Sequence, residues 1–122
     1  MKVPDFPERQ PGHYLGTVIA GKWWNRYMQH GFFARGNGVY WLDAEGFCFL
    51  RHLTGRPLVI PYALVVDVKI GRGHAGRWQP GPGGVLKLVW EYEEKQLSSG
   101  FVVSRVRQET EKIVAGIRKR IT

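Results

Sequence analysis

Residues 85–121 read VLKLVWEYEEKQLSSGFVVSRVRQETEKIVAGIRKRI, and this stretch decides the fold. Between positions 85 and 103 apolar residues alternate with polar ones, which indicates half-buried β-strands. Two strands, at 85–92 and 96–103, are separated by a short turn at 93–95. The side chains expected to face the core are Leu86, Leu88, Trp90, Leu97, Phe101 and Val103. We therefore predict a β-hairpin here.

The apolar period changes in residues 104–121, where apolar side chains recur every three or four positions. The stripe consists of Val106, Thr110, Ile113, Val114, Ile117 and Ile121. A stripe of this width predicts an amphipathic helix. Acidic residues near its start and basic residues at its end match the helix dipole. We expect Ile113 and Ile117 to face the core.

The upstream sequence predicts further short strands. They are expected at 13–20, 39–43, 47–53, 58–60 and 64–70, with tight connections at 44–46 and 54–57. In the last of these strands, Val66, Val68 and Ile70 are expected on one face and Val65, Asp67 and Lys69 on the other. Residues 71–84 are rich in glycine and proline, so we expect a long loop without a regular element.

Length and composition favour one globular domain of mainly β structure. The chain has 122 residues, a formal charge of +8, 16 glycines and one cysteine. Residues 1–35 are interpreted as an N-terminal arm and residues 36–122 as the main body of a single structural unit. A lone Cys48 excludes an intramolecular disulfide framework. The four histidines stand singly, without metal-binding spacing, and no nucleophile–base set is visible. We expect no metal, no cofactor and no enzymatic activity.

Residues 22–33, KWWNRYMQHGFF, predict a short helix in the N-terminal arm. Trp24, Met28 and Phe32 are spaced at i, i+4 and i+8. Basic and aromatic side chains on one short helix are typical of an interfacial membrane helix, and the candidate interface residues are Lys22, Trp23, Arg26 and Tyr27. The alternative is that the aromatic stripe packs on the sheet as part of the core.

The glycine-rich loop offers a second candidate site. Its residues are Lys69, Arg72, His74, Arg77 and Trp78. Backbone amides between glycines can converge on an anion while basic side chains neutralise it, so an anion or lipid headgroup is the expected ligand. The alternative is a solvated hairpin loop that uses glycine for its turns.

The order of strands followed by one C-terminal helix resembles the pleckstrin-homology (PH) superfold, and more narrowly its bacterial and GRAM-like members. The match covers residues 36–121: the hairpin GVYWLDAEGFCFLR, the Ile60-Pro61-Tyr62 turn before LVVDVKI, the strands LKLVW and SSGFVVS, and the helix RQETEKIVAGIRKRI. The resemblance implies a bent antiparallel sheet, or partly open barrel, of six to seven strands capped by the helix. It also implies a binding or scaffolding module, rarely a catalyst.

Two positions depart from that pattern. Eukaryotic members typically carry a tryptophan in the final helix, whereas the inward positions here are Ile113, Val114 and Ile117. In some members a basic motif that binds phosphoinositides lies between the first two strands. Read with strands at 39–43 and 47–53, this sequence has an acidic connection there, at 43–46.

Three functions remain open at the level of sequence. The net charge favours anionic partners. The first function is a module for an anionic membrane surface or a protein partner at that surface, which would place the protein in the cytoplasm or at the inner face of the membrane. The second is a self-associating protein-interaction domain that forms a homo-oligomer. The third, nucleic-acid binding, is disfavoured because the strand aromatics Tyr40, Trp41, Phe47 and Phe49 have mostly apolar neighbours.

Overall fold

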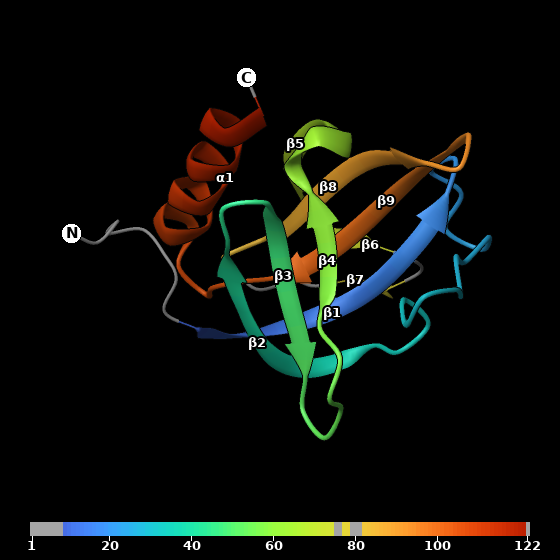
Figure 1. Cartoon of the computed structure of the whole chain (residues 1–122). Coiled ribbons are helices and arrows are strands. Elements are labelled where there is room, and N and C mark those ends of the chain that lie inside the picture. Colours follow the sequence, from blue (N-terminus) through green and yellow to red (C-terminus); the bar gives the residue numbers. More distant parts are fainter. Residues whose placement is uncertain (1–8, 75–76, 79–81, 122) are drawn as a thin grey trace.

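A bent antiparallel sheet of seven strands carries the fold, and one helix covers part of it (Figure 1). The computed structural model describes residues 9–74, 77–78 and 82–121. The strands of the sheet are β1 Gln10–Ile19, β2 Gly36–Leu42, β3 Gly46–Arg51, β4 Leu58–Pro61, β5 Val65–Gly71, β8 Val85–Tyr92 and β9 Lys95–Val102. Their spatial order is β4-β3-β2-β1-β9-β8-β5. Separate from this sheet are a two-stranded hairpin, β6 Gly73–His74 with β7 Arg77–Trp78, the 3₁₀ turn η1 Tyr62–Leu64, and the helix α1 Arg107–Ile121.

Strand β1 lies in the middle of the sheet and pairs with both β2 and β9. A bulge between Tyr14 and Gly16 shifts its register against β9. Bulges bend a strand and increase its twist. The bend lets the two halves of the sheet curl around one apolar core, in which the Tyr14 ring stacks on Phe101 at a centroid separation of 5.1 Å.

The hairpin predicted at 85–103 is confirmed as β8 and β9, paired from Leu86 with Phe101 to Tyr92 with Lys95. The six side chains expected to face the core are all buried. Ser99 is buried as well, at 0% exposure, although the alternation gave no reason to expect a hydroxyl there.

A chain of buried hydrogen bonds explains this serine. Trp90 Nε1 donates to Ser99 Oγ at 3.0 Å, Ser99 Oγ lies 2.6 Å from Thr17 Oγ1, and Thr17 Oγ1 lies 2.6 Å from Tyr14 Oη. Tyr14 Oη donates in turn to the carbonyl oxygen of Phe32 at 2.9 Å. An indole N–H can only donate and a carbonyl can only accept, so the hydroxyl protons all point the same way along the chain. The chain joins β8, β9, β1 and the segment that follows β1.

The C-terminal helix is also confirmed, over Arg107–Ile121. It packs on β5 and η1 and covers one side of the sheet, as Figure 1 shows. Thr110, Val114 and Ile117 are buried and Ile113 is partly buried, as the stripe predicted. Val106 precedes the helix and is exposed.

The helix predicted at 22–33 is wrong, because the segment forms a series of turns. Backbone φ is positive at both ends of the segment, at Ala20, Gly21, His30 and Gly31. A right-handed helix cannot continue through such residues. The Tyr27 amide donates instead to the Thr17 carbonyl at 2.8 Å, so the chain returns to β1. The pairing of this segment with β1 therefore outweighs the helical spacing of Trp24, Met28 and Phe32.

Two smaller expectations are also wrong. Val66 is exposed and Val65 is buried, because a bulge between Val65 and Asp67 places an extra residue in β5 and inverts the alternation before it. The loop expected at 71–84 contains the short hairpin β6–β7, paired at Gly73 with Trp78 and His74 with Arg77.

Candidate functional site

The connection between β1 and β2, residues 20–35, presents large apolar side chains to solvent. Trp23 and Trp24 are each 63% exposed, Met28 is 55% exposed and Phe33 is 59% exposed. The two indole rings pack edge to face at a centroid separation of 5.6 Å. In Figure 1 the connection, drawn in blue to cyan, lies at the side of the sheet away from α1. Because exposed apolar groups are concentrated on this one short segment, the connection is a candidate interaction surface.

Buried neighbours fix this connection to the sheet. Tyr27 and Phe32 are buried, and the Phe32 ring packs on Trp90 at a centroid separation of 5.4 Å. His30 meets the ring of Tyr92 edge on at 5.8 Å. The exposed tryptophans therefore belong to a segment that Tyr27 and Phe32 hold against the sheet. Sequence spacing placed Trp24 on the same helical face as Phe32, yet the structure separates them because the segment is not a helix.

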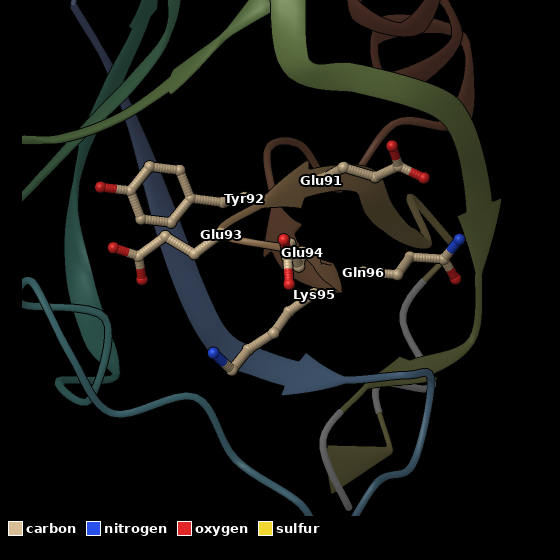
Figure 2. Close-up of a pocket in the computed structure, with 6 residues that line it drawn as sticks. All are labelled: Glu91, Tyr92, Glu93, Glu94, Lys95 and Gln96. Carbon is tan, nitrogen blue, oxygen red and sulfur yellow. The ribbon is translucent and has the colours of Figure 1, made fainter.

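The charge around the connection is asymmetric. No Asp or Glu occurs between Arg9 and Leu42, whereas Lys22, Arg26 and Arg35 all belong to the connection. The turn between β8 and β9 is acidic, and Figure 2 shows its side chains, Glu91, Glu93 and Glu94 together with Tyr92, Lys95 and Gln96. This acidic turn lies beside the connection, because the Ala20 amide donates to the Gln96 carbonyl at 2.8 Å. Burial raises the pKa of Tyr27, and Glu93 raises it further.

The four candidate interface residues of the arm fall into two groups. Lys22 and Trp23 are exposed at the surface of the connection. Arg26 is half-buried, and its Nη2 donates to the Phe33 carbonyl at 3.1 Å. Tyr27 is buried beneath the connection. Only the first two can meet a flat surface without rearrangement of the segment.

The structure describes the side chains of three of the five candidate loop residues, and these three have different surroundings. Lys69 is exposed on β5 and Arg72 is exposed in the bend before β6. His74 is only 6% exposed, and its Nε2 donates to the Ser98 carbonyl at 2.8 Å. The side chains of Arg77 and Trp78 lie outside the described residues.

His74 acts as a packing residue in this structure. Its ring covers Gly100, where a Cβ atom would lie 2.5 Å from the His74 Cγ. Burial lowers the pKa of His74 to about 4, against the opposing effect of the Ser98 hydrogen bond. The charges of Lys87 and Arg35 lower this pKa further, and a hydrogen bond with the Gly16 backbone raises it. His74 is therefore neutral near pH 7 and brings no charge to an anion.

Sequence reasoning missed Arg35 and Lys87, which lie beside His74 on the outer face of the sheet. The glycines Gly16 and Gly100, inside predicted strands, were the available signal, because a glycine in a strand often marks close approach by another group. Side chains from distant segments fill the space above both glycines.

The described part of the chain holds no group of three or more His, Cys, Asp and Glu side chains placed to bind a metal. Within the same residues, no helix has the length and apolar character needed to cross a bilayer.

The sequence profile of the bacterial PH domain-like family matches residues 4–118, nearly the whole chain. The chain belongs to this family. Among curated proteins, none matches this PH-like domain in sequence. PH-like domains are generally not catalytic, and membership supports a generic binding or scaffolding role.

The position of β1 corrects one detail of the comparison with PH domains. The first two strands of this PH-like domain are β1 and β2, so the connection between them is residues 20–35 and not the acidic turn at 43–46. The turn at 43–46 instead joins β2 to β3. The first connection is therefore basic and aromatic.

Proposed function

We propose that this PH-like domain binds anionic membrane surfaces through the β1–β2 connection. The observation that carries the proposal is the exposed, edge-to-face pair of Trp23 and Trp24 beside Lys22 on an anchored turn. Indole rings favour the headgroup region of a bilayer, where one part of the ring is apolar and the other is wet. Met28 and Phe33 add apolar area on the same connection.

The net charge of +8 provides long-range attraction to such a surface. A basic residue close to an anionic leaflet contributes about 1 kcal/mol and acts within a Debye length. The neighbouring acidic turn at Glu93 and Glu94 limits how closely the β8–β9 end approaches the leaflet. We therefore infer weak, salt-sensitive docking in which the tryptophan pair enters first.

Cosedimentation with vesicles tests the proposal. Vesicles of phosphatidylcholine with phosphatidylglycerol are compared with vesicles of phosphatidylcholine alone. The wild type is expected to bind the anionic vesicles and to lose binding as salt is raised. Trp23→Ser/Trp24→Ser is expected to lose most of the binding, whereas Leu53→Ser/Val66→Ser, which removes two exposed apolar side chains elsewhere, is expected to keep it.

Equal binding to both vesicle types, or equal binding by both double variants, contradicts the proposal. Light scattering of the same proteins detects the competing explanation. If the wild type is a dimer, does not bind vesicles, and becomes monomeric in Trp23→Ser/Trp24→Ser, the tryptophan pair serves self-association instead.

A further inference from the structure

A cavity of about 280 Å³ lies at the open side of the curved sheet, between the edge strand β4 and the end of β8. Its walls come from β4 and the residue before it, from η1, from β8 and from the β1–β2 connection. The pairing of β5 with β8 ends at Val65 and Trp90, so β8 continues past the start of β5 to Tyr92. The mouths of β-barrels are among the usual places for small-molecule sites.

Five rings that line this cavity form a closed series of contacts. Tyr27 lies against Phe32 at a centroid separation of 5.9 Å, and Phe32 lies against Trp90 at 5.4 Å. Trp90 contacts Tyr92 at 6.0 Å, and Tyr92 contacts His30 at 5.8 Å. His30 meets Tyr27 at 6.3 Å, which closes the series. The β1–β2 connection and β8 thus contribute their rings to one wall.

The remainder of the wall is apolar, and it consists of Pro57, Leu58, Val59, Pro61 and Leu64. These side chains offer no hydrogen bond to a ligand. An apolar cavity of about 150 Å³ is large enough for benzene. The cavity beside β4 therefore has room for a compact group such as trimethylammonium together with a short attached chain.

Electronegative groups gather beside this cavity. Tyr27 is only 3% exposed, and its Oη is buried without a hydrogen-bond partner in the described structure. Burial raises the pKa of this phenol, and the nearby Glu93 and Tyr92 raise it further. Figure 2 shows the side chains of Tyr92 and Glu93 extending in the same direction from the β8–β9 turn. On a chain with a net charge of +8, this acidic turn favours a positively charged ligand.

We propose that the cavity binds the quaternary ammonium group of a small soluble molecule among the five rings, with Glu93 as the counter-charge. The negative faces of aromatic rings attract a cation, and cages of such rings recognise quaternary ammonium groups. A quaternary ammonium has no N–H group, so it needs no acceptor from the apolar wall. A primary ammonium would leave N–H groups unsatisfied there, which is costly.

The acidic turn also favours a soluble ligand over a lipid headgroup. In the membrane proposal, Glu93 and Glu94 limit how closely this end of the sheet approaches an anionic leaflet. The ammonium site uses neither Trp23 nor Trp24, so the two proposals can fail independently.

Titration with choline chloride tests the site, with amide and indole N–H chemical shifts as the readout. Sodium chloride controls for ionic strength. The alcohol 3,3-dimethylbutan-1-ol has carbon in place of the nitrogen of choline and controls for apolar burial alone. Choline is expected to shift the Trp90 indole and Tyr92 amide resonances to saturation and to leave Glu109, in the first turn of α1, unchanged. The neutral alcohol is expected to need about tenfold higher concentration for the half-maximal shift, which corresponds to 1.4 kcal/mol.

A double variant separates the cage from general effects. Tyr92→Leu/Glu93→Gln removes one ring and the counter-charge, whereas Trp41→Leu/Glu45→Gln removes a half-buried ring and an exposed carboxylate elsewhere. The site variant is expected to need about tenfold more choline than the wild type, and the control is expected to match the wild type. Equal choline affinities of the two variants overturn the proposal, as does a wild type that binds choline no more tightly than the alcohol. If the site variant does not fold, the wild-type comparison of choline with the alcohol remains the test.

Vesicles of phosphatidylcholine distinguish a soluble ligand from a lipid. If the wild type binds these neutral vesicles but not free choline, and the site variant loses that binding, the cavity recognises a lipid headgroup and the proposal of a soluble ligand is wrong. Because Trp23 and Trp24 are intact in Tyr92→Leu/Glu93→Gln, this variant is expected to keep binding to anionic vesicles. Its behaviour with those vesicles therefore reports on the membrane proposal separately.

Discussion

Arg118 reaches from α1 to the edge strand β5, where its Nη2 donates a hydrogen bond to the Val68 carbonyl oxygen at 2.8 Å. Edge strands offer unpaired backbone groups to other chains. Arg118 satisfies one of these groups on β5. At the opposite edge, Pro57 precedes the short strand β4 and Pro61 is its last residue. A peptide that adds a strand to β5 would have to displace the helix contact first. This disfavours strand addition as a binding mode.

Arg118→Ala is expected to lower the free energy of unfolding by about 1 kcal/mol, because the Val68 carbonyl loses its donor. Chemical denaturation measures the change. Arg105→Ala removes an exposed arginine just before α1 and is expected to change stability by less than half as much. Equal effects of the two substitutions would show that charge, and not the hydrogen bond, is responsible.

Ser99→Ala is expected to lower the free energy of unfolding by about 1–3 kcal/mol, since Trp90 Nε1 loses its acceptor in the core and the Thr17 hydroxyl loses one of its two hydrogen bonds. The neighbouring Ser98 is partly buried on the other face of β9, so Ser98→Ala is the matched control, with an expected change near zero. Urea unfolding of both variants measures the two changes in the free energy of unfolding. A Ser99→Ala protein as stable as the wild type would falsify the role assigned to the hydrogen-bond chain.

Acid is expected to destabilise the protein through His74. Its pKa is about 4 in the folded state and about 6.5 in the unfolded chain, so the unfolded state binds more protons between these values. The stabilisation is fully present above pH 6.5 and is lost as the pH falls toward 4. The difference between the two pKa values corresponds to roughly 3 kcal/mol.

Unfolding of wild type and His74→Gln across this pH range measures the effect. The variant is expected to be less stable near pH 7 and to lose less stability between pH 6.5 and pH 4. His52→Gln, at an exposed histidine, should keep the wild-type slope. Parallel pH profiles for wild type and His74→Gln would contradict the assignment.

Glu94→Gly is expected to raise the free energy of unfolding by up to about 1 kcal/mol, because a left-handed backbone costs a non-glycine residue about that much. Glu93 and Glu94 form the two-residue turn between β8 and β9, with φ values of +52° and +65°. Positive φ at both positions is the pattern of a type I′ hairpin turn, which favours glycine. Glu45→Gly makes the same change where φ is not positive and is expected to be neutral or destabilising. Thermal unfolding of the wild type, Glu94→Gly and Glu45→Gly measures the two changes in stability.

The sequence by itself determined the parts of the fold in which local period and tertiary environment agree. The hairpin from Leu86 to Val103 and the part of the helical stripe from Thr110 to Ile117 were predictable because one face of each element meets a single core. The same is true of the general class of fold. The acidic turn at Glu93 and Glu94 was also predictable, since only a short turn fits between the two alternating runs.

Only the tertiary structure decided the candidate sites. The spacing of Trp24, Met28 and Phe32 suits a helix, but pairing of the segment with β1 and the positive φ values at Gly21 and His30 prevent one. The meeting of Arg26 and Arg35 above Gly16 arises because the β1–β2 connection returns to β1, where Arg26 pairs with Val18, and because a glycine leaves space there. Register and free space depend on residues far apart in the chain, so local periodicity carries no record of them.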